Sequence, residues 1–163
     1  MTDPNEEIVR QYLEMRGYFV RTNVAYKRRK EETGKASSGW GDLDLLAWHP
    51  NGTRLLVEVK GWHTEDVTPS YFDVKEPYID VLMRRAAANI FGTADFKAVL
   101  IVSSVGPQSM EAVKDRARKQ GIDQLWTFSQ ILSALVKGVK INENQRSEVL
   151  QMTRLFKVFH FVE

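Results

Sequence analysis

Two apolar segments on either side of an Asn-Gly turn constrain the fold of this chain more than any other feature. Residues 42–48 and 54–60 have the length and apolar character of strands, and Pro50-Asn51-Gly52-Thr53 joins them. An Asn-Gly pair between apolar runs is a strong β-hairpin signal. The sequence therefore predicts an antiparallel hairpin over residues 42–60.

Helices and strands alternate around this hairpin. The first helix is marked by Asp3 or Asn5 as its cap and by Pro4 in its first turn, and Gly17 ends it. Further strands are predicted over 18–26, 97–103 and 124–128, further helices over 78–91, 107–120, 129–137 and 142–159, and polar loops over 27–39 and 61–76. This order predicts an α/β domain with a mixed central sheet flanked by helices.

The composition fits one compact domain. The chain has 163 residues, of which 43% are hydrophobic and 27% charged, as in ordinary globular proteins. Its lack of cysteine excludes a disulfide scaffold, a zinc-thiolate site, an iron–sulfur cluster and a cysteine nucleophile. The polar, acidic N-terminus and the absence of a long apolar run favour a cytoplasmic protein without membrane association.

Four charged residues occupy the two hairpin strands. Asp42 and Asp44 alternate with Leu43 and Leu45, and Glu58 and Lys60 alternate with Val57 and Val59. In a regular strand alternate residues share a face, so each charged pair is expected to point away from its apolar neighbours. Charges in apolar strands need a partner, a metal ion or water.

The length of the hairpin loop decides whether these charges meet. A two-residue Asn51-Gly52 loop places Asp44 opposite Val59, with Glu58 and Lys60 on the other face. A three-residue loop or a single bulge instead places Asp44 opposite Glu58 or Lys60. If the three charges form one site, the hairpin must have the wider loop or the bulge.

Such a cluster has a defined chemistry. Carboxylates on neighbouring strands bind Mg²⁺, or Mn²⁺ as a substitute, and the metal can activate water for attack on a phosphoryl group. The Val59 carbonyl is a further candidate oxygen ligand. An ammonium group such as Lys60 can orient that water or stabilise developing negative charge.

At these residues the sequence resembles the PD-(D/E)xK nuclease superfamily. The resemblance lies in Gly41-Asp42-Leu43-Asp44 and Glu58-Val59-Lys60, with Glu6-Glu7-Ile8-Val9 and Gly17-Tyr18-Phe19-Val20 upstream. The Holliday-junction-resolvase-like small nucleases look most similar. The resemblance implies a restriction-endonuclease-like core over about residues 5–128, matched in element order through about residue 103. A helical C-terminal extension follows over about 129–163.

The resemblance also implies a function. It assigns Asp44 and Glu58 as metal ligands, Lys60 as the catalytic lysine, and Glu6, with Glu7 as the alternative, as a helper glutamate. The usual proline before the aspartate is replaced by Leu43, as in members with a Gly-acidic-apolar-Asp version. The implied activity is Mg²⁺-dependent endonuclease cleavage of DNA, on branched or repair substrates among others. The alternatives are a non-catalytic nucleic-acid-binding or assembly module that keeps the fold, and an RNA-processing nuclease with the same core.

Candidate DNA contacts flank the two motifs. Residues 21–35 hold six basic and two acidic residues, a net charge of +4. This segment is either a phosphate-binding loop or a solvated one. The candidate DNA-binding residues are Lys27, Arg28, Arg29, Lys30, Trp62 and His63. Trp40 and Trp62 can stack on bases or cover the core. His63 can contact a phosphate, shuttle a proton or be a polar loop residue, and His49 is expected to be a solvated turn residue.

An apolar stripe marks the last predicted helix. Val149, Met152, Phe156 and Phe159 recur at helical spacing. We expect this stripe to cover the core, with a homodimer interface as the alternative. A homodimer would give a nuclease one active site for each strand of a duplex.

Overall fold

The computed structural model describes residues 3–29, 34, 38–60, 65–140, 142 and 147–159. The elements are α1 (Pro4–Met15), β1 (Phe19–Arg28), β2 (Gly39–Trp48), β3 (Arg54–Val59), the 3-10 helix η1 (Pro69–Phe72), α3 (Val81–Phe91), β4 (Lys97–Val102), α4 (Met110–Lys119), β5 (Gln124–Thr127), α5 (Phe128–Gly138) and α6 (Glu148–Val158). Among the described helices, none has the length and apolar character needed to cross a membrane.

The five strands form one open mixed sheet in the order β1-β2-β3-β4-β5. The pairs β1–β2 and β2–β3 are antiparallel, whereas β3–β4 and β4–β5 are parallel. The predicted α/β class with a mixed sheet is therefore confirmed.

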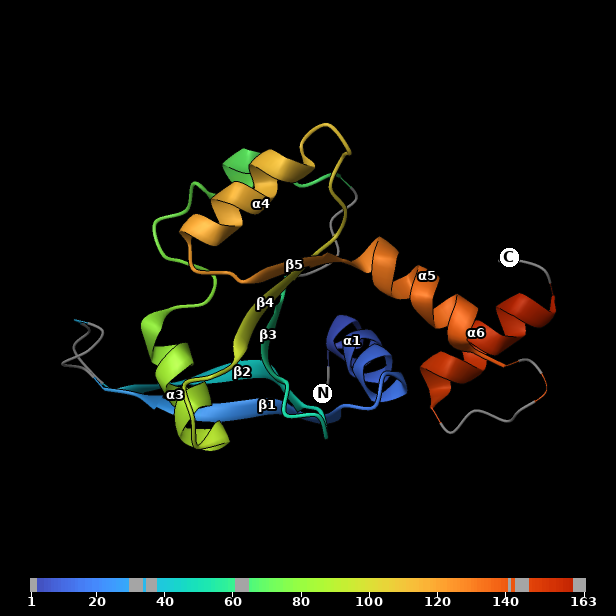
Figure 1. The fold of residues 1–163 in the computed structure, drawn as a ribbon, viewed down its shortest axis with the longest axis horizontal. Coiled ribbons are helices and arrows are strands. Elements are labelled where there is room, and N and C mark those ends of the chain that lie inside the picture. The colour runs from blue at the N-terminus through green and yellow to red at the C-terminus, as the bar shows by residue number, and fades with distance from the viewer. Residues whose placement is uncertain are drawn as a thin grey trace.

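Helices cover both faces of this sheet (Figure 1). The connections through α3 and α4 both step the same way along the sheet, and right-handed crossovers therefore place these two helices on one face. Their apolar residues pack there with Leu46, Leu56 and Leu100. The other face carries α1 and α5, whose Leu13 and Phe128 lie in a second buried cluster.

Several helix ends follow local capping chemistry. The Asp3 carboxylate accepts a hydrogen bond from the Asn5 N–H at 2.7 Å, and Pro4 opens α1 as predicted. Helix α3 begins later than the predicted residue 78 because the Asp80 carboxylate accepts the Met83 N–H at 2.8 Å. Thr127 and Gln130 form a reciprocal capping box at the start of α5.

Two predicted loops contain ordered structure. Strand pairing between Lys27↔Trp40 and Arg28↔Gly39 lengthens β1 and β2 into the predicted loop 27–39. The predicted polar loop 61–76 contains η1, and Phe72 of this 3-10 helix is buried in the α3 and α4 face. An aromatic residue in a polar segment was the signal for this packing.

The last helix differs from its prediction. Helix α6 begins at Glu148, after the Ser147 cap, instead of at residue 142. Residues 141 and 143–146 lie outside the described part of the chain. No residue of α6 is buried, and Phe159, which follows it, is 66% exposed. The expectation that its apolar stripe covers the core is therefore wrong, although Leu150 contacts the α1 and α5 cluster.

Candidate active site

The β2–β3 hairpin has the wider loop that a shared site requires. The strands pair through Trp48↔Arg54, Ala47↔Leu55 and Leu45↔Val57. Beyond them the His49 N–H donates to the Thr53 carbonyl at 2.9 Å, which leaves Pro50-Asn51-Gly52 as a three-residue loop. Gly52 has φ +94°, a conformation that favours glycine at this end of such loops. Extended by one residue beyond Leu45↔Val57, this register places Asp44 opposite Glu58, as a single site requires.

The pairing of β1 with β2 is interrupted at the same level. Ladder pairs form at Thr22↔Leu45 and at Val24↔Leu43, on either side of Asn23 and Asp44. Asn23 has φ +51°, in the left-handed region that asparagine tolerates better than most residues. The face to which alternate side chains point therefore changes at this position in both strands.

This shift corrects the regular alternation that the sequence suggests. Leu45 packs in the α1 and α5 cluster, but Leu43, two residues earlier, packs in the cluster under α3 and α4. In β1 the same change of face occurs between Val20, which packs against the α1 and α5 cluster, and Val24, which lies in the α3 and α4 cluster. Asp44 thus occupies the point where β2 changes faces.

The Asp44 side chain takes part in the sheet itself. Its Oδ2 accepts a hydrogen bond from the Val59 N–H at 2.7 Å, although Val59 lies beyond the last ladder pair of β2 with β3. The next residue, Lys60, still donates its N–H to the Ile101 carbonyl of β4 at 3.0 Å. Strand β3 therefore separates from β2 while it stays beside β4, and the charged residues lie at this separation.

Asp44, Glu58 and Lys60 are neighbours at this point. The Lys60 ammonium donates to Glu58 Oε1, and the Asp44 and Glu58 carboxyl groups are close enough to influence each other's pKa. Glu58 is 6% exposed. Burial, and then the neighbouring Asp44 carboxylate, raise the pKa of Glu58 to about 7. Burial likewise raises the pKa of Asp44, against the hydrogen bond from Val59 and the charge of Lys60.

Glu6 approaches the same site from α1. Burial and then the Asp44 carboxylate raise the Glu6 pKa, whereas a hydrogen bond with the Asn23 side chain lowers it. Glu7 is occupied elsewhere, since its carboxylate accepts from Arg10 at 2.6 Å and from Gln11 at 2.9 Å. Glu6 is therefore the helix glutamate that faces Asp44.

The oxygens at this site suit a hard cation. Oε2 of Glu58 and Oε2 of Glu6 are buried and lack a hydrogen-bond partner, although buried carboxylate oxygens are normally paired. Mg²⁺ and Mn²⁺ prefer such oxygen ligands. In the described part of the chain, no three histidine, cysteine or acidic side chains are grouped closely enough to hold a metal ion as they stand. The Glu6 and Glu58 carboxylates both have Asp44 as a neighbour.

Three tyrosines that the sequence analysis did not identify border the site. The Lys60 ammonium lies 5.8 Å from the centroid of the Tyr78 ring, and the Tyr78 hydroxyl donates to the Tyr71 carbonyl at 2.7 Å. Burial raises the pKa of Tyr78 to about 12, so this phenol stays neutral. Burial raises the pKa of the Tyr26 phenol, and the Glu58 charge adds a smaller contribution. Two aromatic residues in the predicted polar loop, Tyr71 and Phe72, were the available signal.

The candidate DNA-binding residues have different surroundings. Lys27 and Arg29 are exposed, whereas the Arg28 guanidinium donates to the Tyr26 hydroxyl at 2.9 Å and lies 3.7 Å from Asp80. Lys30, Trp62 and His63 lie outside the described residues. Trp40 is 73% exposed, so it does not cover the core. Asp42 is also exposed, although its charge reaches Glu6.

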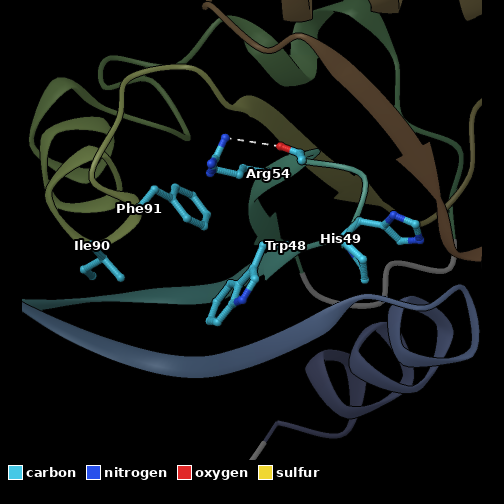
Figure 2. A pocket seen from close by; sticks show the side chains of 7 residues that line it. Trp48, His49, Arg54, Ile90 and Phe91 are labelled. Atoms are coloured by element: carbon cyan, nitrogen blue, oxygen red, sulfur yellow. Dashed lines mark hydrogen bonds between the residues drawn. The ribbon is translucent and has the colours of Figure 1, made fainter.

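The opposite end of the hairpin carries a separate pocket of about 510 Å³ (Figure 2). Trp48, Phe91 and Arg54 line it, and the Arg54 guanidinium donates to the Gly52 carbonyl at 3.2 Å. The His49 ring packs edge-on against Tyr18 at 5.0 Å between ring centroids, so it is not a simple solvated turn residue. None of Asp44, Glu58 and Lys60 lines this pocket.

Comparison with known proteins adds no assignment to this geometry. No protein-family model matches the chain, and neither the curated proteins nor the solved structures contain a significant match. The residues of the site are therefore what indicates its function.

Proposed function

We propose that this protein is a metal-dependent endonuclease that hydrolyses DNA phosphodiester bonds on a restriction-endonuclease-like core. The observation that carries the proposal is that Glu58 contacts Lys60 and neighbours Asp44 where β3 separates from β2. The order of α1, the β1–β2–β3 meander, α3 and β4 supports the same core.

The carboxylates would hold the metal. Asp44 and Glu58, joined by Glu6, are the proposed ligands, with the Val59 carbonyl as a further candidate oxygen. When bound there, Mg²⁺ or Mn²⁺ supplies positive charge to the phosphoryl group and lowers the pKa of a coordinated water. Burial raises the pKa of all three carboxylates, and the Asp44 charge raises those of Glu6 and Glu58 further. A cation bound among them would offset that cost.

Lys60 would act on the substrate side of this cluster. Its ammonium contacts Glu58 on one side and the Tyr78 ring on the other, and its side chain is 32% exposed. A positive group that is both positioned and accessible can orient the attacking water and stabilise the negative charge that develops on phosphate. The aliphatic part of the Lys60 side chain and the Tyr78 ring restrict the positions that the Lys60 ammonium can reach.

The test is cleavage of plasmid and branched DNA with Mg²⁺ or Mn²⁺. We expect wild-type protein to cleave, and Asp44→Asn and Lys60→Ala to lose at least a hundredfold in rate. Asp42→Asn is the matched control because Asp42 is a nearby but exposed carboxylate. Equal cleavage by wild type and both site variants, or no cleavage by any of them, would overturn the proposal. DNA binding without cleavage would instead support the non-catalytic binding module.

A further inference from the structure

A groove of about 490 Å³ lies between β1 and α3, apart from the carboxylate cluster. Its volume falls in the range of established ligand sites, roughly 300–1,000 Å³. Lys27 and Arg29 line it from β1 and the residue that follows, and Arg85 and Asn89 line it from α3.

The groove has the charge of an anion site. Three of its described lining residues are basic and none is acidic. Arg85 and Asn89 are four residues apart on α3 and therefore share a side of the helix. Arginine, lysine and asparagine side chains are frequent donors to phosphate oxygens in nucleic-acid complexes.

Tyr26 connects this groove with the carboxylate cluster. Tyr26 lines the groove and is buried in the cluster against which Tyr78 packs, and the Tyr78 ring lies 5.8 Å from the Lys60 ammonium. Gly41, the partner of Tyr26 across the β1–β2 ladder, makes room for the Tyr26 ring, since a Cβ at position 41 would lie 2.8 Å from it. One packed cluster of side chains thus connects the basic groove with the surroundings of Lys60.

We propose that Lys27, Arg29, Arg85 and Asn89 bind the phosphodiester backbone of the DNA strand on its way to the Asp44–Glu58–Lys60 site. This inference rests on the proposed nuclease function and adds the path of the substrate. The groove contacts phosphates, so it contributes affinity without reading sequence. Its contribution weakens with salt because each neutralised phosphate releases counterions.

The experiment measures binding of a fluorescent DNA duplex by polarisation between 50 and 200 mM salt. All proteins carry Asp44→Asn, so that the DNA stays intact although Mg²⁺ is present. The test variant is K27E/R85E. The matched control is R118E/K119E on α4, which changes the net charge equally and lies outside the groove.

We expect K27E/R85E to bind at least tenfold more weakly, with a salt slope that is shallower by about two. The control should stay within twofold of the parent. Asn89→Asp adds one negative charge to the groove and should weaken binding severalfold while the thermal midpoint stays unchanged. This milder variant separates lost binding from misfolding.

Three results would overturn the inference: no binding by the parent, unchanged affinity of K27E/R85E, or equal losses in both double variants. Failure of the groove is distinguishable from failure of the nuclease proposal, because cleavage is assayed separately in proteins that retain Asp44. A protein that cleaves DNA but tolerates K27E/R85E has the proposed activity and a different substrate path.

Discussion

Replacing Glu58 with glutamine should make the metal-free protein more stable at alkaline pH. Glu58 is buried beside Asp44, and these surroundings raise its pKa to about 7 from an ordinary value of 4.5. Below pH 4.5 the carboxyl group is protonated in both the folded and the unfolded chain. As the pH rises from 4.5 to 7, the unfolded chain releases the proton and the folded chain keeps it, so the free energy of unfolding falls.

The size of this effect follows from the two pKa values. One pKa unit corresponds to about 1.4 kcal/mol, so Glu58 costs the folded state about 3 kcal/mol at pH 8 relative to pH 4. Glutamine has nearly the same shape and carries no charge to desolvate. We therefore expect Glu58→Gln to match wild type near pH 4.5 and to exceed its free energy of unfolding by about 3 kcal/mol at pH 8.

The assay is urea unfolding with EDTA present at several pH values from 4.5 to 8. Glu7→Gln is the control of opposite sign, because the hydrogen bond from Arg10 lowers the Glu7 pKa. That interaction stabilises the protein above pH 4.5 and is lost as the pH falls, so Glu7→Gln should lower stability at pH 8. A Glu58→Gln protein whose stability follows the wild-type pH curve would refute the assigned charge burial.

Two further predictions concern backbone positions near the site. Asn23→Ala should lower the free energy of unfolding by about 1–2 kcal/mol, because alanine is unfavourable at φ +51°. Asn23→Gly should keep most of the stability, and equal losses in both variants would show that the Glu6 hydrogen bond matters instead. Thr127→Ala should cost about 1 kcal/mol through the lost cap of α5. Thr127→Ser should restore it in the same denaturation assay, and no loss on Thr127→Ala would contradict the capping role.

Much of the sheet follows from local sequence rules. The Asn-Gly turn and the strand lengths predict the hairpin, and the three-residue loop gives the register that brings Asp44 opposite Glu58. Alternating helices and strands predict the parallel half, because short βαβ connections impose it. The capping residues Asp3 and Pro4 likewise define the start of α1.

The features that the sequence does not predict depend on contacts between residues that are distant in sequence. The face change at Asn23 and Asp44 breaks strand periodicity, and a single positive φ leaves little trace in composition. Tyr78 reaches Lys60 only because the segment around η1 folds back onto the sheet. The apolar stripe of α6 has a helical period, but period alone does not say whether anything covers it.

The double interruption of β1 and β2 has a consequence for how the chain can change. At the same ladder position, both strands change which of the two buried faces their alternate side chains point to, so the alternation of one strand must match that of the other. If Asn23 alone returned to regular geometry, Val24 and Tyr26 would turn toward the wrong layer, while Leu43 would stay where it is. An insertion or deletion in one strand is therefore tolerable only with a compensating one in the other. This requirement fixes the position of the Asp44 side chain in the sheet.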